Sequence, residues 1–117
     1  MKKKIAILGS TGSIGKTLIK IIKEKKNDFN IVLLTANKNY KELINQTKKF
    51  DVKNIIITDK FCLNKFKKIN KNKKIKIFED FKSFDKIFKK KIDYVMSSIV
   101  GLDGLYPTLK IIFKFFY

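Results

Sequence analysis

The chain has 117 residues, 44% of them hydrophobic, and a formal net charge of +18. This length fits one domain with a modest core, and the hydrophobic content excludes a disordered tail. No apolar run approaches the roughly 18 residues of a membrane helix, and the apolar run after the basic start is too short for a signal peptide. We therefore expect a cytoplasmic protein with no membrane partner.

The positive charge alone would suggest a nucleic-acid partner. All 28 basic residues are Lys, however, and Arg is the side chain that makes bidentate contacts to guanine and phosphate. The Lys are spread along the chain and accompany many Ile, Asn and Phe, a pattern typical of AT-rich coding sequence. We therefore interpret the charge as a compositional bias and expect no nucleic-acid partner.

Short apolar runs alternate with segments of helical spacing along the chain. The predicted elements, in chain order, are a strand at 4–8, a helix at 13–25, a strand at 31–36, a helix at 40–50, a strand at 54–58, a helix at 61–69, a strand at 75–78, a helix at 81–90, a strand at 93–97 and a helix at 105–116. Such alternation predicts a parallel sheet covered on both faces, with right-handed crossovers. We therefore predict one α/β domain over residues 1–117, with a Rossmann-like, doubly wound and mainly parallel sheet.

Apolar residues at helical spacing indicate which helix faces pack on this sheet. They are Ile14, Leu18, Ile21 and Ile22 in the first helix, Leu43 and Ile44 in the second, and Leu63, Phe66 and Ile69 in the third. The single cysteine, Cys62, excludes an internal disulfide and a cysteine metal site, and we expect a buried thiol.

A glycine-rich loop, residues 9–15, separates the first predicted strand from the first helix, where a dinucleotide pyrophosphate would meet a helix N-terminus. Gly9 would make the tight turn, Gly12 would let the backbone approach the phosphates, and Gly15 would let the helix pack closely on the sheet. Hydroxyl donors beside the free N–H groups come from Ser10, Thr11 and Ser13. The loop predicts a dinucleotide site, with a glycine-rich turn that binds nothing as the alternative.

A second phosphate-binding motif, the P-loop, is partly matched by Gly15, Lys16 and Thr17. The motif requires a glycine five residues before Gly15, and that position is Ser10. Lys16 would also lie inside the first helical turn without the loop that aims it. Hydrolysis of a nucleoside triphosphate is therefore the weaker alternative.

The second predicted strand ends without the Asp or Glu that grips the ribose 2′-hydroxyl of NAD. Lys38 follows this strand, and its charge would attract the 2′-phosphate of NADP, which a carboxylate would repel. Asn39 would donate a further hydrogen bond. The segment therefore favours NADP over NAD, although Lys38 is also one of 28 Lys.

Three segments together resemble the 1-deoxy-D-xylulose 5-phosphate reductoisomerases. They are KIAILGSTGSIG at 4–15, ANKN at 36–39 and SIVGLDGLYPTL at 98–109, at spacings that match the family over about residues 3–112. Asn37 departs from the family's usual glycine, although asparagine tolerates a left-handed conformation better than most residues. Ser97 and Ser98 replace small alanines of the family.

The resemblance implies an NADPH site made of Ser10, Thr11, Gly12, Ser13, Ile14, Asn37, Lys38 and Asn39. Within it, residues 11–14 would line the pyrophosphate site, and Lys38 and Asn39 would hold the 2′-phosphate. Neither a catalytic residue nor a metal ligand of the family is matched in this chain.

The same resemblance implies a reaction. Family members rearrange 1-deoxy-D-xylulose 5-phosphate and reduce the product with NADPH to 2-C-methyl-D-erythritol 4-phosphate, in the non-mevalonate route to isoprenoids. They are homodimers and need Mg or Mn, held by carboxylates downstream of this chain. We therefore expect an NADPH-binding domain without the family's catalytic and C-terminal domains, inactive alone and in contact with substrate only through those domains. The alternative is a binding-only nucleotide module or a gene remnant without a catalytic role.

Overall fold

The computed structural model describes residues 2–88, 92–99 and 107. Its strands are β1 (Lys3–Leu8), β2 (Phe29–Ala36), β3 (Asn54–Ile57), β4 (Lys76–Phe78) and β5 (Tyr94–Ser97). Its helices are α1 (Ser13–Glu24), α2 (Tyr40–Phe50), α3 (Lys60–Ile69), the 3₁₀ turn η1 (Phe81–Ser83) and the short α4 (Phe84–Ile87). The predicted alternation of strands and helices is confirmed.

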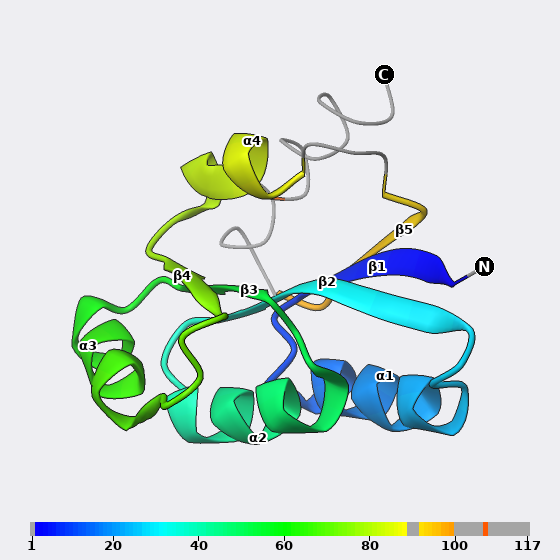
Figure 1. The fold of residues 1–117 in the computed structure, drawn as a ribbon, viewed down its shortest axis with the longest axis horizontal. Coiled ribbons are helices and arrows are strands. Elements are labelled where there is room, and N and C mark those ends of the chain that lie inside the picture. The colour runs from blue at the N-terminus through cyan, green and yellow to red at the C-terminus, as the bar shows by residue number, and fades with distance from the viewer. Residues whose placement is uncertain (1, 89–91, 100–106, 108–117) are drawn as a thin grey trace.

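These strands form one sheet in the order β4-β3-β2-β1-β5, and every pair of neighbours is parallel. The chain winds outward from β1 through β2 and β3 to β4, and then crosses back to place β5 on the other side of β1 (Figure 1). Helices α1 and α2 cover one face of the sheet, and α4 lies over the opposite face (Figure 1). The predicted Rossmann-like, doubly wound fold is therefore confirmed.

Two apolar clusters hold the layers together, one on each face of the sheet. The run of three isoleucines in β3 shows why both faces are apolar. Ile55 and Ile57 pack in the cluster with α1, α2 and α3, whereas Ile56 packs in the cluster with Phe84 and Phe88. All three isoleucines are fully buried, as expected for a strand covered on both sides.

An irregularity in β2 sets the register at the end of the sheet that carries the glycine loop. Ile5 of β1 pairs with Ile31, but Ala6 pairs with Leu33, so Val32 is an extra residue in β2. Such a bulge shifts all later positions of the strand by one residue. As a result, Thr35 lies at the height where the chain leaves β1.

Several details differ from the sequence-based expectations. Ile14, Ile21 and Ile69 are about half exposed, at 59%, 51% and 48%. Ile22 is buried in α1 as expected and Leu18 is partly buried against the core, but Gly15 and Ile19 complete the inward face. The helix expected at 81–90 is a 3₁₀ turn followed by one helical turn that ends at Ile87. The helix expected at 105–116 lies outside the described residues, except for helical residue 107.

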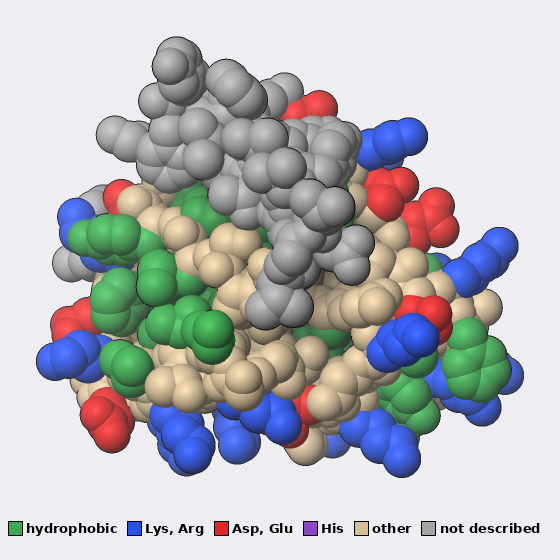
Figure 2. Space-filling model, turned by 180° about the vertical axis from the view of Figure 1, so that it is seen from behind, with side chains coloured by type: hydrophobic (Ala, Val, Ile, Leu, Met, Phe, Trp, Pro, Cys, Tyr) green, Lys and Arg blue, Asp and Glu red, His purple; other side chains and the backbone are tan. Residues whose placement is uncertain are grey.

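The positions of Cys62 and of the Lys side chains agree with the sequence-based expectations. Cys62 is a buried free thiol, as predicted. On the face drawn in Figure 2, Lys side chains are scattered around the edges and do not gather into one patch. No helix in the described part of the chain is long and apolar enough to cross a bilayer.

Candidate cofactor site

A cavity of about 520 Å³ opens at the carboxyl edge of the sheet. Its lining comes from the ends of β2, β3 and β5, from the glycine loop after β1 and from η1: Gly9, Thr11, Gly12, Thr35, Ala36, Asn37, Thr58, Phe81, Ser98 and Ile99. Because β1 lies between β2 and β5, this edge is the topological switch point, where open α/β sheets bind their ligands. The volume falls within the roughly 300–1,000 Å³ of small-molecule sites.

The three glycines of the loop have different roles. Gly9 has a φ of +74°, a left-handed conformation that favours glycine. A Cβ on Gly15 would overlap the Gly9 carbonyl oxygen and lie 2.6 Å from the Ser10 Cα. The close approach at Gly15 is therefore to the loop, whereas Ile19 and Ile22 pack α1 on the sheet. A Cβ on Gly12 would meet, among the described residues, only the Gly9 carbonyl oxygen at 3.7 Å. The cavity therefore has open space at Gly12.

Hydrogen bonds from three other elements fix the first half of the loop. The Gly9 N–H donates to the Thr35 hydroxyl at 2.9 Å, and the Ser10 N–H donates to the Thr35 carbonyl at 3.0 Å. The Ser98 hydroxyl lies 2.8 Å from the Gly9 carbonyl oxygen, and the Gln46 side-chain amide donates to the Ser10 carbonyl at 3.0 Å. The loop is therefore tied to β2, to the end of β5 and to α2.

The second half of the loop leads into α1, whose N-terminus differs from those of the next two helices. In α2 the Asn39 side chain accepts the Glu42 N–H, and in α3 the Asp59 side chain accepts the Cys62 N–H. In α1 the N-cap is Gly12, which has no side chain to accept a hydrogen bond. The first N–H groups of a helix have no intrahelical acceptor, and together with the helix dipole they favour an anion.

The turn after β2 lies against the end of β3. The Thr58 hydroxyl donates to the Asn37 side-chain oxygen at 2.8 Å, and the Asp59 N–H donates to the Asn37 carbonyl at 3.1 Å. Asn37 does not use a left-handed conformation, because Asp51 alone has a positive φ among the described non-glycine residues. Hydrogen bonds from Thr58 and Asp59, which follow β3, therefore hold Asn37 in this turn.

The carboxylate of Asp59, the N-cap of α3, interacts electrostatically with Lys38. The pKa of Asp59 is lowered from its ordinary value, chiefly because its carboxylate accepts the Cys62 N–H, and also because of the positive charge of Lys38. The pKa of the Cys62 thiol is raised, chiefly by burial. No carboxylate follows β2, but Asp59 at the N-cap of α3 places a negative charge where it acts on Lys38.

Comparison with known proteins places this geometry in a family. The family model described as 1-deoxy-D-xylulose 5-phosphate reductoisomerase matches residues 5–114. The chain belongs to this reductoisomerase family. It is 57% identical over 112 residues to the reductoisomerase of Pelagibacter ubique (strain HTCC1062), and 35% identical over 113 residues to that of Clostridium botulinum (strain Alaska E43 / Type E3). Each comparison covers 94% of this chain and 29% of the relative, so the chain spans less than a third of these reductoisomerases.

Solved reductoisomerase structures have the same fold. The reductoisomerase of Zymomonas mobilis in complex with NADPH superposes with a TM-score of 0.85 at 27% identity, over 96% of this chain and 30% of that one. A reductoisomerase in complex with NADPH, fosmidomycin and magnesium gives a TM-score of 0.81 at 26% identity, over 92% and 27%. Both similarities support the sequence-based assignment of the fold.

The eight residues expected at the cofactor site do not all line the cavity. Thr11, Gly12 and Asn37 do. Ser10 is fully buried, with its hydroxyl 3.4 Å from the Thr35 carbonyl, so its side chain points into the protein. The other four are exposed and lie outside the lining: Ser13, Ile14, Lys38 and Asn39.

Sequence analysis missed other residues at and around this cavity. Thr35 had a visible signal, because it is a polar residue within an apolar run just before the strand ends. Thr58 and Phe81 had none, because only the order of the strands brings them beside the glycine loop. Gln46, which lies outside the cavity lining, also had a visible signal, because it is a polar residue on the same helix face as Leu43.

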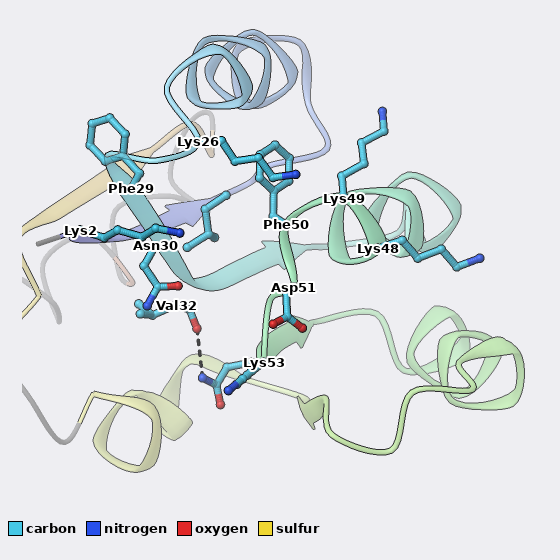
Figure 3. A pocket seen from close by; sticks show the side chains of 12 residues that line it. Lys2, Lys26, Phe29, Asn30, Val32, Lys48, Lys49, Phe50, Asp51 and Lys53 are labelled. Carbon is cyan, nitrogen blue, oxygen red and sulfur yellow. Dashed lines mark hydrogen bonds between the residues drawn. The ribbon is translucent and has the colours of Figure 1, made fainter.

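A second cavity of about 400 Å³ lies at the opposite, amino edge of the sheet (Figure 3). Five Lys contribute to its lining: Lys2, Lys26, Lys48, Lys49 and Lys53. The Lys48 and Lys49 side chains extend from α2 away from Lys2 and Lys26, so these charges do not converge on one point (Figure 3). The glycine loop is at the other edge, and this cavity is not a candidate for the dinucleotide.

The carboxylates do not form a metal site in the described part of the chain. No group of three or more His, Cys, Asp and Glu side chains in residues 2–88 and 92–99 is placed to hold an ion. Asp103 lies outside the described residues. Hard divalent cations need several oxygen ligands, so these residues do not fit the magnesium found with the related structure.

Proposed function

We propose that this chain is the NADPH-binding part of a 1-deoxy-D-xylulose 5-phosphate reductoisomerase of isoprenoid biosynthesis. One observation supports the proposal most strongly. The N-terminus of α1 has no side-chain cap, and the glycine at that position borders an open cavity at the switch point of the sheet. The reductoisomerase of Zymomonas mobilis, which has the same fold, was solved with NADPH.

The pyrophosphate would bind at the N-terminus of α1. The backbone N–H groups of residues 11, 13 and 14 would donate to the phosphate oxygens, and the helix dipole would favour their negative charge. The Gly12 N–H already donates to the Gly9 carbonyl oxygen at 3.3 Å. A Cβ on Gly12 would project into this space, whereas glycine leaves it open. The loop therefore fits the expected cofactor.

The adenosine end would lie along the turn after β2. Lys38 is exposed and free to turn toward a 2′-phosphate. The Asn39 side-chain oxygen is already used to cap α2, so only its NH₂ group would be free to bind the cofactor. Asp59 would partly oppose the charge of Lys38, because a carboxylate repels a phosphate.

When bound, NADPH supplies a hydride, and the residues of this chain would hold and orient the cofactor. Phe81 and Ile99 offer apolar surface on the cavity wall, and Ser98 lies at the end of β5 beside them. We assign the substrate, the divalent metal and the homodimer contacts of the whole enzyme to residues beyond those described. A cytoplasmic location also stays a prediction.

Direct titration tests the proposal. NADPH fluorescence is followed as the 117-residue chain is added, and circular dichroism checks that the chain is folded. We expect saturation at one NADPH per chain. A folded chain that shows no saturable binding would overturn the proposed function.

A further inference from the structure

Gln46 and Thr47 are the two buried polar residues of α2. Gln46 is 1% exposed and lies on the face of α2 that also buries Leu43 and Thr47. Its Nε2 donates a hydrogen bond of 3.0 Å to the carbonyl of Ser10, a residue 36 positions earlier in the chain. This hydrogen bond joins α2 to the Ser10 carbonyl.

This glutamine is not the residue that helix packing alone would favour. Among the described residues, no hydrogen-bond donor reaches its Oε1, which is buried. An unpaired buried acceptor is destabilising, and an apolar side chain of similar size would avoid that cost. The hydrogen bond to Ser10 is therefore the feature that distinguishes glutamine at this position.

The hydrogen bond from Gln46 to the Ser10 carbonyl also fixes the direction of the Thr11 N–H, because both groups belong to one peptide unit. The Ser10 carbonyl and the Thr11 N–H belong to one planar trans peptide, in which they point in opposite directions. When Gln46 holds the carbonyl toward α2, the Thr11 N–H must point away from α2. Thr11 lines the cavity, and none of the described backbone hydrogen bonds uses its N–H.

We propose that Gln46 is a positioning residue for the cofactor, which aims the Thr11 N–H at the pyrophosphate by holding the Ser10 carbonyl. This inference rests on the proposed function and extends it to a residue outside the cavity. Gln46 acts on the pyrophosphate, which NADPH and NADH share. Its loss should therefore weaken both cofactors by the same factor and leave the preference between them unchanged.

The test compares Gln46→Met with Thr47→Val in the full chain. Methionine keeps the size and flexibility of glutamine but cannot donate to Ser10. Thr47 is a buried neighbour whose hydroxyl bonds only to Ile44 of its own helix, so its variant controls for loss of a buried polar group in α2. We expect Gln46→Met to weaken NADPH and NADH binding each by about tenfold, and Thr47→Val to leave both unchanged.

A second measurement reports on the loop directly. In the ligand-free chain, the amide NMR signal of Thr11 should move in Gln46→Met and stay in place in Thr47→Val. Gln46→Leu, which removes the donor together with the unpaired acceptor, should repeat both effects. If the Gln46 variants bind both cofactors as tightly as the wild type and their Thr11 signal does not move, the proposed role of Gln46 is overturned. The proposed function would still stand. A folded wild-type chain that binds neither cofactor would overturn the proposed function itself, and this inference with it.

Discussion

At the scale of single residues, the proposed preference for NADPH over NADH depends on Lys38. It follows a strand that ends without a carboxylate, and it is exposed at the turn beside the cavity. Lys38→Glu should remove the preference for NADPH over NADH, a loss of about 1.5–3 kcal/mol if one charge-assisted hydrogen bond dominates. Titration of both cofactors measures the change. Lys41→Glu changes the net charge equally at an exposed position of α2 and should keep the preference. A Lys38 variant that still prefers NADPH would show that another residue binds the 2′-phosphate.

Asp59 links the stability of α3 to pH. Its pKa is lowered in the folded chain, so folding favours its ionised form. The resulting stabilisation is present above the ordinary aspartate pKa of about 4 and is lost as the pH falls through the lower folded-state pKa. Asp59→Asn keeps an N-cap but cannot titrate, so this variant should lose less stability in acid than the wild type. Thermal melts from neutral pH to pH 2.5 would show this, with the exposed Asp28→Asn as control. Parallel curves for Asp59→Asn and the wild type would contradict the prediction.

At the scale of elements, the contact between α1 and the glycine loop depends on Gly15. A Cβ there would overlap backbone atoms of Gly9 and Ser10, which cannot move aside as a side chain would. We expect Gly15→Ala to lower the free energy of unfolding by about 1–3 kcal/mol, the usual range for overpacking. Gly12→Ala should cost less than about 1 kcal/mol, because this N-cap position borders open space. Urea unfolding of the two variants measures the difference. Equal losses would mean that α1 does not pack on the loop as described.

The elements themselves were predictable because their signals are local. The apolar runs and the glycine loop placed all five described strands and α1 to α3 within two residues of their ends. The inward face of α1 was predictable only in part: Ile22 is buried and Leu18 packs against the core, whereas Ile14 and Ile21 are exposed. The close approach of Gly15 to the loop depends on tertiary contacts that spacing alone does not show. The anchors of the loop depend on tertiary register. Thr35 reaches Gly9 only because Val32 is an extra residue in β2.

At the scale of the whole molecule, the chain combines a cofactor cavity with a charge that opposes cation binding. The net charge is +18, and the described carboxylates form no cluster that would hold a metal. We therefore predict that the 117-residue chain does not convert 1-deoxy-D-xylulose 5-phosphate by itself, with or without added magnesium or manganese. NADPH consumption, followed by its absorbance at saturating substrate and metal, measures this. Turnover above the enzyme-free blank would contradict the prediction, provided that Gly12→Val abolishes it.

The central claim is that the open space at Gly12 holds the pyrophosphate of NADPH. Calorimetric titration of NADPH into the wild type and into Gly12→Val tests this claim most directly, with a thermal melt of each chain alongside. Gly12 has a φ of −75° and a ψ of 176°, an extended conformation that valine adopts readily, so the variant should fold. We predict that the wild type binds NADPH and that folded Gly12→Val does not, because the valine methyl groups occupy the space of the phosphates. Equal affinity in the two folded chains would contradict the account and would leave the glycine loop as no more than a turn.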